Sequence, residues 1–293
     1  MIRFSKYMWI YFVISAFVIV PGLISLLFFG LRPAVDFTGG TLLELRFASQ
    51  VSETDIQSLL SKHTITASSI QNTGGNTYLI RLKPEKAETL TALESTLQSN
   101  TPKVTISRNE TVGPVLGKEL LQKTVTAAIF AIIAIMSYVA YAFKNIKFGI
   151  SAILALVHDL IVVLGVFSLL GHFYHVEVDT LFVTAFLTTM SFSVHDTIVV
   201  FDRIREMIRR GEKLPFEALC DVALTETIGR SVTNSLTIIF MLFALVLMGG
   251  DSVRWFVMAL LVGTISGTYS SPFIATPVLI LWDRFERKKM KVS

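Results

Sequence analysis

Six apolar runs, each long enough to cross a bilayer, constrain the fold of this chain more than any other feature. They occupy about residues 9–29, 125–143, 148–170, 178–201, 231–248 and 255–281. Roughly 20 apolar residues in a helix span the hydrocarbon core of a membrane. The composition agrees, because 52% of the residues are hydrophobic and only 16% are charged. We therefore expect an all-α membrane bundle of six transmembrane helices, with a separate domain in the polar stretch between the first two runs.

The first run resembles a signal peptide, because Arg3 and Lys6 precede it. It continues without a charge from Trp9 to Phe29, however, and no small-residue cleavage site follows. This length favours a retained helix.

Basic residues predict the orientation of the helices. They cluster in the N-terminal arm, after the second run, in the loop 202–230 and in the C-terminal tail, whereas the short connections 171–177 and 249–254 contain only Arg254. Under the positive-inside rule both termini are cytoplasmic. The predicted parts are residues 1–30 (N-terminus and first helix), 31–124 (outer domain) and 125–293 (the other five helices, with the cytoplasmic loop and tail). Because the bases lie beside apolar runs, we expect contact with membrane lipids and not with nucleic acid.

The outer domain is predicted to be an α+β ferredoxin-like domain with the order βαββαβ. Alternating apolar residues indicate strands, and a Ser52–Asp55 cap signal opens a helix. The expected strands are 41–48, 65–71, 77–82 and 103–108, with helices after the first and third. The domain contains no metal-ligand cluster or catalytic triad, so we expect a folded ectodomain whose most plausible activity is binding a polypeptide.

A short motif links the first helix to this domain. Its residues are Asp36, Phe37, Thr38, Gly39 and Gly40. The glycine pair permits positive φ or close backbone approach. We interpret the motif as a rigid or hinged connector and not as a ligand site.

Acidic residues inside two of the apolar runs are the strongest functional signal, since a carboxylate in hydrocarbon costs at least about 2.5–3.5 kcal/mol. Asp196 follows Thr189 and Ser193 along one face of the fourth run. A second polar stripe opens the fifth run and consists of Arg230, Thr233, Asn234 and Thr237. We expect the two stripes to face each other. Either Asp196 is reversibly protonated with Arg230 as its charge partner, or the two form a static buried pair.

The third run carries His158 and Asp159. Adjacent helical residues point about 100° apart, which predicts that these two side chains do not share a face. Asp159 is either a second proton-carrying group or a structural acid. His158 and His195 either relay protons or make structural hydrogen bonds. No third ligand has metal-binding spacing, so no metal or other cofactor is expected.

Four segments together resemble the SecF family of bacterial protein-export subunits. They are AVDFTGGTLLEL, LVHDLIVVLGVFSLLG, SFSVHDTIVVFDRIRE and SGTYSSPFIATPVL. The resemblance implies a non-enzymatic subunit of the inner (cytoplasmic) membrane. It also implies a twelve-helix unit with SecD, related to resistance-nodulation-division transporters, which uses the proton gradient during late preprotein translocation. The SecYEG translocon, YajC and unfolded preprotein are the further partners it implies.

The resemblance assigns proton coupling to Asp196 and Arg230, and it leaves the role of Asp159 open. Two departures keep the site small and polar: Ser191-Phe192-Ser193 replaces Gly-Tyr-Ser, and Ser231-Val232-Thr233-Asn234-Ser235 replaces Thr-x-x-Thr-Ser.

Two other functions fit the same helix pattern. One is a proton-coupled exporter of small molecules or lipids, and the other is a membrane scaffold in which the ion pair only fixes packing. A single compact outer domain favours polypeptide contact over export of small molecules.

Overall fold

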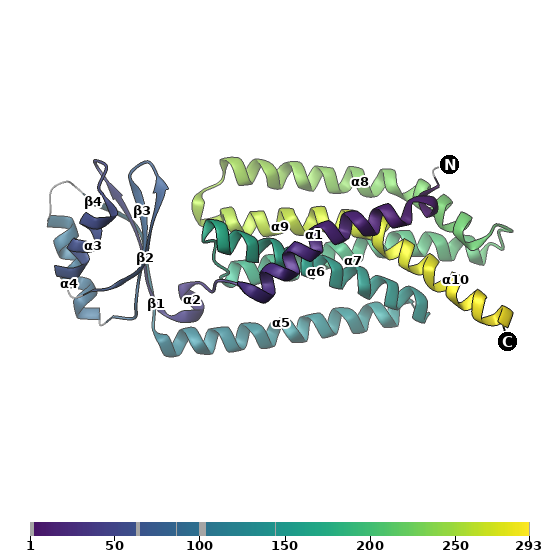
Figure 1. The fold of residues 1–293 in the computed structure, drawn as a ribbon, viewed down its shortest axis with the longest axis horizontal. Helices are drawn as coiled ribbons and strands as arrows, with labels where there is room; N and C mark the ends of the chain where they lie inside the picture. Colours follow the sequence, from purple (N-terminus) through teal and green to yellow (C-terminus); the bar gives the residue numbers. More distant parts are fainter. Residues whose placement is uncertain (1–2, 63–64, 86, 100–103, 144, 293) are drawn as a thin grey trace. The chain divides into compact units, whose positions relative to one another are not determined.

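A computed structural model describes residues 3–62, 65–85, 87–99, 104–143 and 145–292 of the 293-residue chain (Figure 1). The chain forms two compact units. One is helical and combines Met1–Arg32 with Ala127–Ser293, and the other is Pro33–Thr126. We describe each unit by itself.

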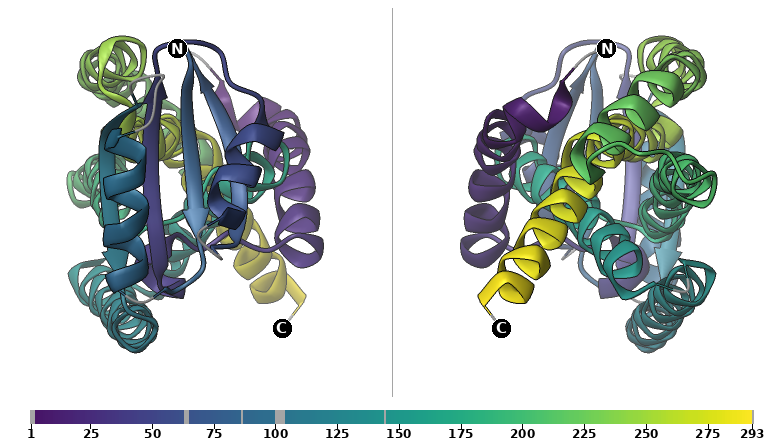
Figure 2. Two further views of the ribbon diagram at one scale, coloured as in Figure 1. Left: turned by 90° about the vertical axis from the view of Figure 1, so that its left-hand side faces the viewer. Right: turned by 90° about the vertical axis from the view of Figure 1, so that its right-hand side faces the viewer.

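The smaller unit contains a four-stranded antiparallel sheet with two helices on one face (Figure 2). Its elements in chain order are β1 (Gly40–Phe47), α3 (Glu53–Lys62), β2 (Ala67–Gly74), β3 (Thr77–Leu82), α4 (Ala87–Ser99) and β4 (Val104–Val112). The strand order in the sheet is β2-β3-β1-β4. The predicted succession of strands and helices is therefore confirmed.

Alternation along β1 fixes which face of the sheet is buried. Leu43 and Leu45 lie in the core with Ile80 of β3, which pairs directly with Leu43. Successive residues of a strand point to opposite faces, so a shift of one residue would expose this apolar set. The predicted cap of α3 is present, because the backbone N–H of Asp55 donates to Ser52 Oγ at 3.2 Å.

The predicted connector motif forms α2 (Val35–Thr38) followed by Gly39 and Gly40. Both glycines have positive φ, 73° and 129°. A Cβ atom at Gly39 would lie 2.6 Å from Pro114 Cα, and one at Gly40 would lie 2.5 Å from Leu82 O. Any other residue at these positions would therefore introduce both backbone strain and a steric clash. The local backbone geometry thus explains why both residues are glycine, and no bound ligand is needed to explain it.

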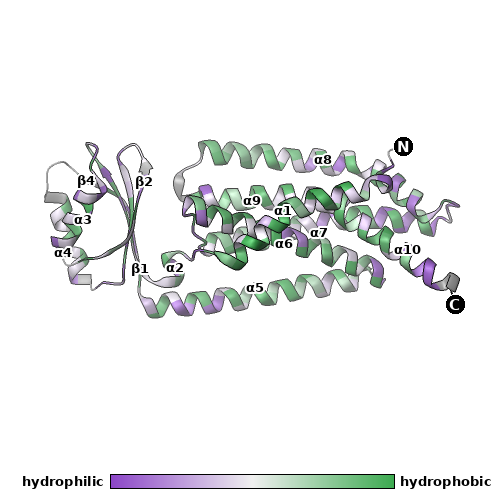
Figure 3. Cartoon of the chain, viewed as in Figure 1, coloured by the Kyte–Doolittle hydropathy of each residue, from purple (hydrophilic) through white to green (hydrophobic). Residues whose placement is uncertain are grey.

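Six helical segments in the described residues are long and apolar enough to cross a membrane, as predicted. Five of them are η1 (Phe4–Tyr7) with α1 (Met8–Phe28), α5 (Pro114–Phe143), α6 (Ile146–Tyr174), α7 (Thr180–Arg209) and α8 (Phe216–Met248). The sixth is α9 (Asp251–Ser270) continuing through η2 (Ser271–Ala275) into α10 (Thr276–Val292). Apolar residues dominate the middle of these helices (Figure 3).

Three boundaries differ from the prediction. α5 begins at Pro114 and not near 125, and the predicted loop 202–230 is mostly helical, with only 210–215 between α7 and α8. The charged side chains there pair with one another. Arg203 Nε donates to Glu226 Oε2 at 2.6 Å, and its Nη1 donates to Glu206 Oε2 at 2.6 Å. The connection is therefore shorter than predicted, and these ion pairs support the two helix ends.

The last span is also not the single regular helix that was predicted. Five residues with π-helical hydrogen bonding, Ser271–Ala275, separate α9 from α10. Pro272 and Pro277 lack the backbone N–H that an α-helix uses, and this favours a local change of helix geometry. The segment lies beside α6 and α7 in the centre of the bundle.

Both described ends of the helical unit lie at the end where α7 joins α8 (Figure 1). The α6–α7 and α8–α9 connections lie at the opposite end. Helices α6, α7 and α9 form the buried centre, whereas few side chains of α1 and α8 are fully buried. Exposed apolar side chains such as Phe17, Phe240 and Leu247 suit a lipid environment.

Candidate functional site

Asp159 is the centre of a buried hydrogen-bond network. Its carboxylate accepts hydrogen bonds from Ser193 Oγ on α7 at 2.5 Å and from two hydroxyls of α9, Ser266 Oγ and Ser270 Oγ, each at 2.6 Å. Only 5% of Asp159 is exposed. Hydrogen bonds to a carboxylate are among the stronger ones in proteins, so three helices are joined at one side chain.

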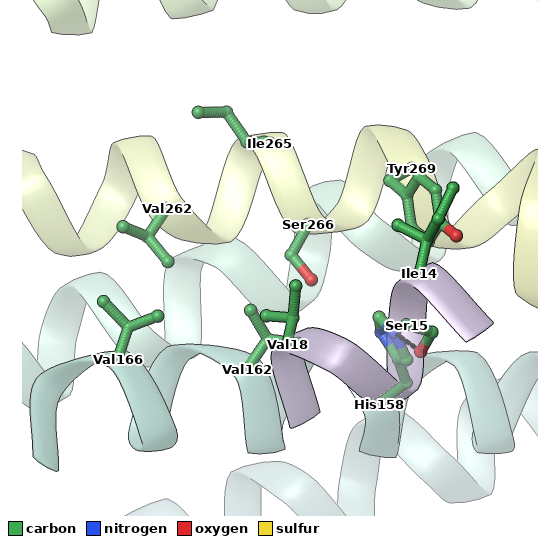
Figure 4. Close-up of a pocket in the computed structure, with 10 residues that line it drawn as sticks. All are labelled: Ile14, Ser15, Val18, His158, Val162, Val166, Val262, Ile265, Ser266 and Tyr269. Carbon is green, nitrogen blue, oxygen red and sulfur yellow. Dashed lines mark hydrogen bonds between the residues drawn. The ribbon is translucent and has the colours of Figure 1, made fainter. Parts of the chain in front are cut away.

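His158 extends this network to α1. Its Nδ1 lies 2.9 Å from Asp159 Oδ1, and its Nε2 lies 2.6 Å from Ser15 Oγ (Figure 4). The two neighbours face different helices, as predicted, since His158 contacts α1 and Asp159 contacts α7 and α9. Their side chains nevertheless bond each other. The imidazole ring is long enough to bring a nitrogen back to the adjacent carboxylate, although the two Cβ directions diverge.

The hydrogen bonds of this network constrain which groups donate and which accept. Within the described residues the carboxylate of Asp159 has an ion-pair contact with His158 and none with Lys or Arg. An ionised carboxylate only accepts hydrogen bonds, whereas a protonated one also donates. Gaining a proton at Asp159 therefore requires at least one neighbouring hydroxyl or the imidazole to change its hydrogen bond.

Two close helix contacts build this site. A Cβ at Gly263 would lie 2.3 Å from Thr189 Cγ2, and one at Gly267 would lie 3.1 Å from Ser193 Cα. The two glycines, four residues apart, therefore let α9 pack closely against α7 within the chain. This close approach brings the α9 serines within reach of Asp159.

Asp196 lies in a different environment from Asp159. It is 8% exposed and lines a cavity of about 270 Å³ between α7, α8, α9 and η2. Ser235 Oγ is 3.4 Å from its Oδ2, and Ser231 and Ser271 also line the cavity. A carboxylate beside a cavity with several hydroxyls has space for water.

The predicted pairing of Asp196 with Arg230 is not present. No salt bridge joins the two side chains in the part of the chain that the structure describes, and Arg230 is exposed on α8. The two charges are still close enough to interact electrostatically. Arg230 instead lines a charged groove of about 670 Å³ with Asp202, Arg203 and Glu226.

The rest of the predicted α8 stripe is exposed as well. It comprises Thr233, Asn234 and Thr237, and the two threonine hydroxyls donate to carbonyls of α8 itself, Gly229 O and Thr233 O. Ser231 and Ser235 face Asp196 in its place. Successive residues of a helix point about 100° apart. The predicted stripe containing Arg230 and Asn234 is one residue away from Ser231 and Ser235, and it therefore lies on a different face of α8.

The predicted α7 stripe is buried, but its residues belong to two different sites. Thr189 donates to a carbonyl of its own helix, Ser193 bonds Asp159, and Asp196 lines the cavity. His195 is exposed and does not belong to the network.

Sequence reasoning did not assign six hydroxyls of these sites: Ser15, Ser231, Ser235, Ser271, Ser266 and Ser270. The last two have the i, i+4 spacing that places residues on one helix face, as do Ser231 and Ser235. That spacing was the available signal. Ser15 had none, because a single serine in an apolar helix is common.

No group of three or more His, Cys, Asp or Glu side chains that could hold a metal ion occurs in the part of the chain described by the structure. Cys220 is fully buried. The Asp221 carboxylate beside it accepts from the backbone N–H and the hydroxyl of Ser5, at 2.8 and 2.7 Å. These groups hold the N-terminal segment against α8.

The comparison with known proteins identifies the family. A family model described as "Protein export membrane protein SecD/SecF, C-terminal" matches residues 92–285, and a second, "SecD/SecF GG Motif", matches residues 24–51. The chain belongs to the SecD/SecF family. Asp159 and Asp196 lie within the residues that the first model matches, and Gly39 and Gly40 of the connector lie within those that the second matches.

Two curated relatives carry the name protein translocase subunit SecF. The protein of Thermobaculum terrenum is 40% identical over 97% of this chain and 94% of its own length. The protein of Anaerolinea thermophila is 38% identical over 95% of this chain and 93% of its own length. SecF proteins therefore match the chain over nearly their whole length.

Solved structures match as well. The crystal structure of SecDF from Thermus thermophilus, a translocon-associated membrane protein, has a TM-score of 0.86 and 31% identity over 97% of this chain. This chain corresponds to 39% of that SecDF chain. SecDF in its super-membrane-facing form matches with a TM-score of 0.67 and 30% identity.

Proposed function

We propose that this chain is a SecF-type accessory subunit of the Sec protein translocase. With SecD, it couples the proton-motive force to late-stage translocation of preproteins across the cytoplasmic membrane. Near-full-length similarity to SecF proteins supports the subunit assignment. Nothing in these similarities favours the alternative, an exporter of small molecules or lipids, and the proposed role is transport without enzymatic activity.

One observation carries proton coupling: two buried carboxylates lie on the central membrane helices without a Lys or Arg ion pair among the described residues. Charged groups at membrane depth are expensive and mark ion or proton paths. Hydroxyl groups surround both carboxylates, and hydroxyls can donate to the ionised form or accept from the protonated form. The coupling ion is thus the proton, with Asp196 and Asp159 as its carriers and His158 as the neighbour of Asp159.

The partner surface is the exposed face of α7 and α8. α7 exposes Thr184, Thr188, Ser191 and His195, and α8 exposes Arg230, Thr233, Asn234 and Thr237. Polar side chains avoid lipid, so another protein's helices should cover this face. SecD is the proposed partner, since this chain matches 39% of a SecDF chain. Arg230 and His195 would then act at the boundary between the two subunits.

The proposed topology places both termini in the cytoplasm of the cell and the smaller unit outside the cytoplasmic membrane. Basic residues beside the helix ends support this orientation. The strand order β2-β3-β1-β4 with two helices on one face supports a ferredoxin-like domain. Its proposed task is contact with unfolded preprotein, beside SecYEG and YajC.

Two substitutions test this function: Asp196→Asn and Asp159→Asn. Each keeps the shape of the side chain but removes its ability to ionise. We expect both to abolish gradient-dependent export while the chain still accumulates and co-purifies with SecD. Asp202→Asn is the matched control, because Asp202 is an exposed acid of the same helix as Asp196.

Measuring preprotein translocation into inverted membrane vesicles, with and without a proton gradient, decides the question. Undiminished export by both variants, in complexes assembled at the wild-type level, would contradict proton coupling. Equal loss in Asp202→Asn would show that the effect is not specific to the buried carboxylates.

A further inference from the structure

Tyr269 of α9 separates two cavities that reach the two buried carboxylate sites. The first cavity, of about 330 Å³, lies between α1, α6 and α9 and is lined by His158 and Ser266 of the Asp159 network (Figure 4). The second, of about 270 Å³, contains Asp196. Tyr269 and Ile265 line both cavities. The tyrosine ring is therefore part of the wall between them.

The hydroxyl of Tyr269 also holds α1. It donates to the backbone carbonyl of Tyr11 at 2.7 Å. One helical turn further along α1, Ser15 Oγ bonds His158 Nε2. Residues four apart lie on the same helix face, so a single turn of α1 is held at two points by the groups around the carboxylates.

The same turn of α1 also has a ring contact, because the centroids of the Tyr11 and Phe273 rings lie 4.7 Å apart. The outward side chains Trp9, Val13 and Phe17 of α1 are 71%, 67% and 82% exposed. Apolar surface facing lipid gives no preference for one helix position over another. The inward contacts, two of which are hydrogen bonds to groups around the carboxylates, therefore hold this turn in place.

The Tyr269 ring lies beside both His158 and the π-helical segment. Its centroid lies 6.3 Å from the His158 ring and 5.2 Å from the ring of Phe273, which is in the π-helical segment. The titratable groups near Tyr269 are Tyr11 on α1, His158 and Asp159 on α6, and Asp196 on α7. The α8 wall of the second cavity contributes Ser231 and no acid or base among the residues described.

We propose that Tyr269 is a positioning residue that transmits the charge state of the carboxylates to α1. When Asp159 gains a proton, its carboxyl group becomes a donor, and a neighbouring hydroxyl or His158 must change its hydrogen bond. Ser266 lies three residues before Tyr269 on α9, and His158 lies against its ring, so the change reaches both points that hold α1. In the chain, α1 leads into the connector and the smaller unit. The proposal rests on the proton-coupled function above.

Infrared difference spectroscopy tests this role in the assembled complex with SecD in lipid. Tyrosine residues are labelled with ring isotopes, and spectra are compared before and after acidification. We expect a tyrosine band that changes with carboxyl protonation and disappears in Tyr269→Phe. It should persist in Tyr141→Phe, the matched control, because Tyr141 is 77% exposed. A purely structural tyrosine would give no band that follows the carboxyl.

The same variants are compared in gradient-driven export. Losing one hydrogen bond to a backbone carbonyl should lower the rate about two- to tenfold, with abundance and SecD association retained. If Tyr269→Phe prevents assembly, Ser15→Ala removes the second contact on the same turn and should give a similar reduction. Wild-type export in either assembled variant, or a tyrosine band retained in Tyr269→Phe, would overturn the proposal.

The outcome can be separated from failure of the function itself. If Asp159→Asn and Asp196→Asn abolish export while Tyr269→Phe does not, only the role of Tyr269 is wrong. If the two carboxamide variants export normally, proton coupling is wrong, and the role of Tyr269 falls with it.

Discussion

At the scale of single residues, the two buried acids differ in how many groups depend on them. Asp159 satisfies three serine hydroxyls and His158, whereas Asp196 has one long contact to Ser235 and an adjoining cavity. Leaving a buried polar group without its partner costs about 1–3 kcal/mol. Stability should therefore depend mainly on Asp159, while exchange with water should occur more readily at Asp196.

Replacing Asp159 by leucine should destabilise the protein far more than replacing it by asparagine. Leucine leaves several buried hydroxyls without an acceptor, at a cost of roughly 1–3 kcal/mol for each, whereas asparagine keeps one carbonyl oxygen. Thermal unfolding of the purified protein in detergent measures the difference. Equal midpoints for the two variants would contradict the central role of Asp159 in packing.

The serines of α8, and not its exposed stripe, should tune Asp196. Ser235→Ala removes a buried hydroxyl beside the carboxylate, so we expect a shifted carbonyl stretch of protonated Asp196 in infrared spectra. Thr237→Ala is the control, because this exposed hydroxyl bonds its own helix. A shift caused by Thr237→Ala and absent in Ser235→Ala would show that the wrong face was assigned.

At the scale of helices, glycine contacts decide how closely the elements approach. Gly263 and Gly267 bring α9 against α7, and Gly22 meets Gly165 between α1 and α6, where a Cβ on Gly165 would lie 2.6 Å from Gly22 Cα. Small residues permit such approach in membranes. Serine networks and glycine contacts alternate along α9, so packing and site geometry depend on each other.

Gly263→Val should therefore lower stability by about 1–3 kcal/mol through overpacking against Thr189. A second change, Thr189→Gly, should restore part of the loss by removing the atoms that clash. Gly229→Ala is the matched control. No atom lies within 4 Å of its Cβ position, and alanine favours a helix over glycine by about 1 kcal/mol. Equal destabilisation at both glycines, measured by thermal unfolding, would contradict the close-contact explanation.

At the scale of the whole molecule, the chain divides into a unit that the membrane stabilises and a unit with its own apolar core. The core of the smaller unit contains Leu43, Leu45, Ile80, Leu93 and Leu97. The helical unit instead exposes large apolar side chains over α1, α5 and α8. Only the smaller unit has the burial pattern of a water-soluble protein.

Residues 33–126 expressed alone should therefore fold in water. At about 0.05–0.15 kcal/mol per residue, this predicts an unfolding free energy of roughly 5–14 kcal/mol. Circular dichroism should show mixed helix and strand and a single cooperative thermal transition. A spectrum without a transition would mean that the sheet requires the membrane helices.

Sequence patterns alone predicted the number of membrane helices, the order of strands and helices in the smaller unit, and the two acids on α6 and α7. These follow from local rules, since hydrophobic length, alternation and capping depend on neighbours along the chain. The same rules placed the end of α7 too early and the beginning of α8 too late along the chain. Both helices continue through charged residues, which form ion pairs between them such as Arg203–Glu226.

Which polar groups meet depends on the packing of the helices in three dimensions. The tertiary structure placed Ser235 and not Arg230 at Asp196, joined Ser15, Ser266 and Ser270 to the His158–Asp159 pair, and broke the last span at Ser271–Ala275. Helix spacing says which residues share a face but leaves the rotation of each helix about its axis open. That rotation is set by close contacts between helices, such as Gly263 against Thr189, which no local pattern contains.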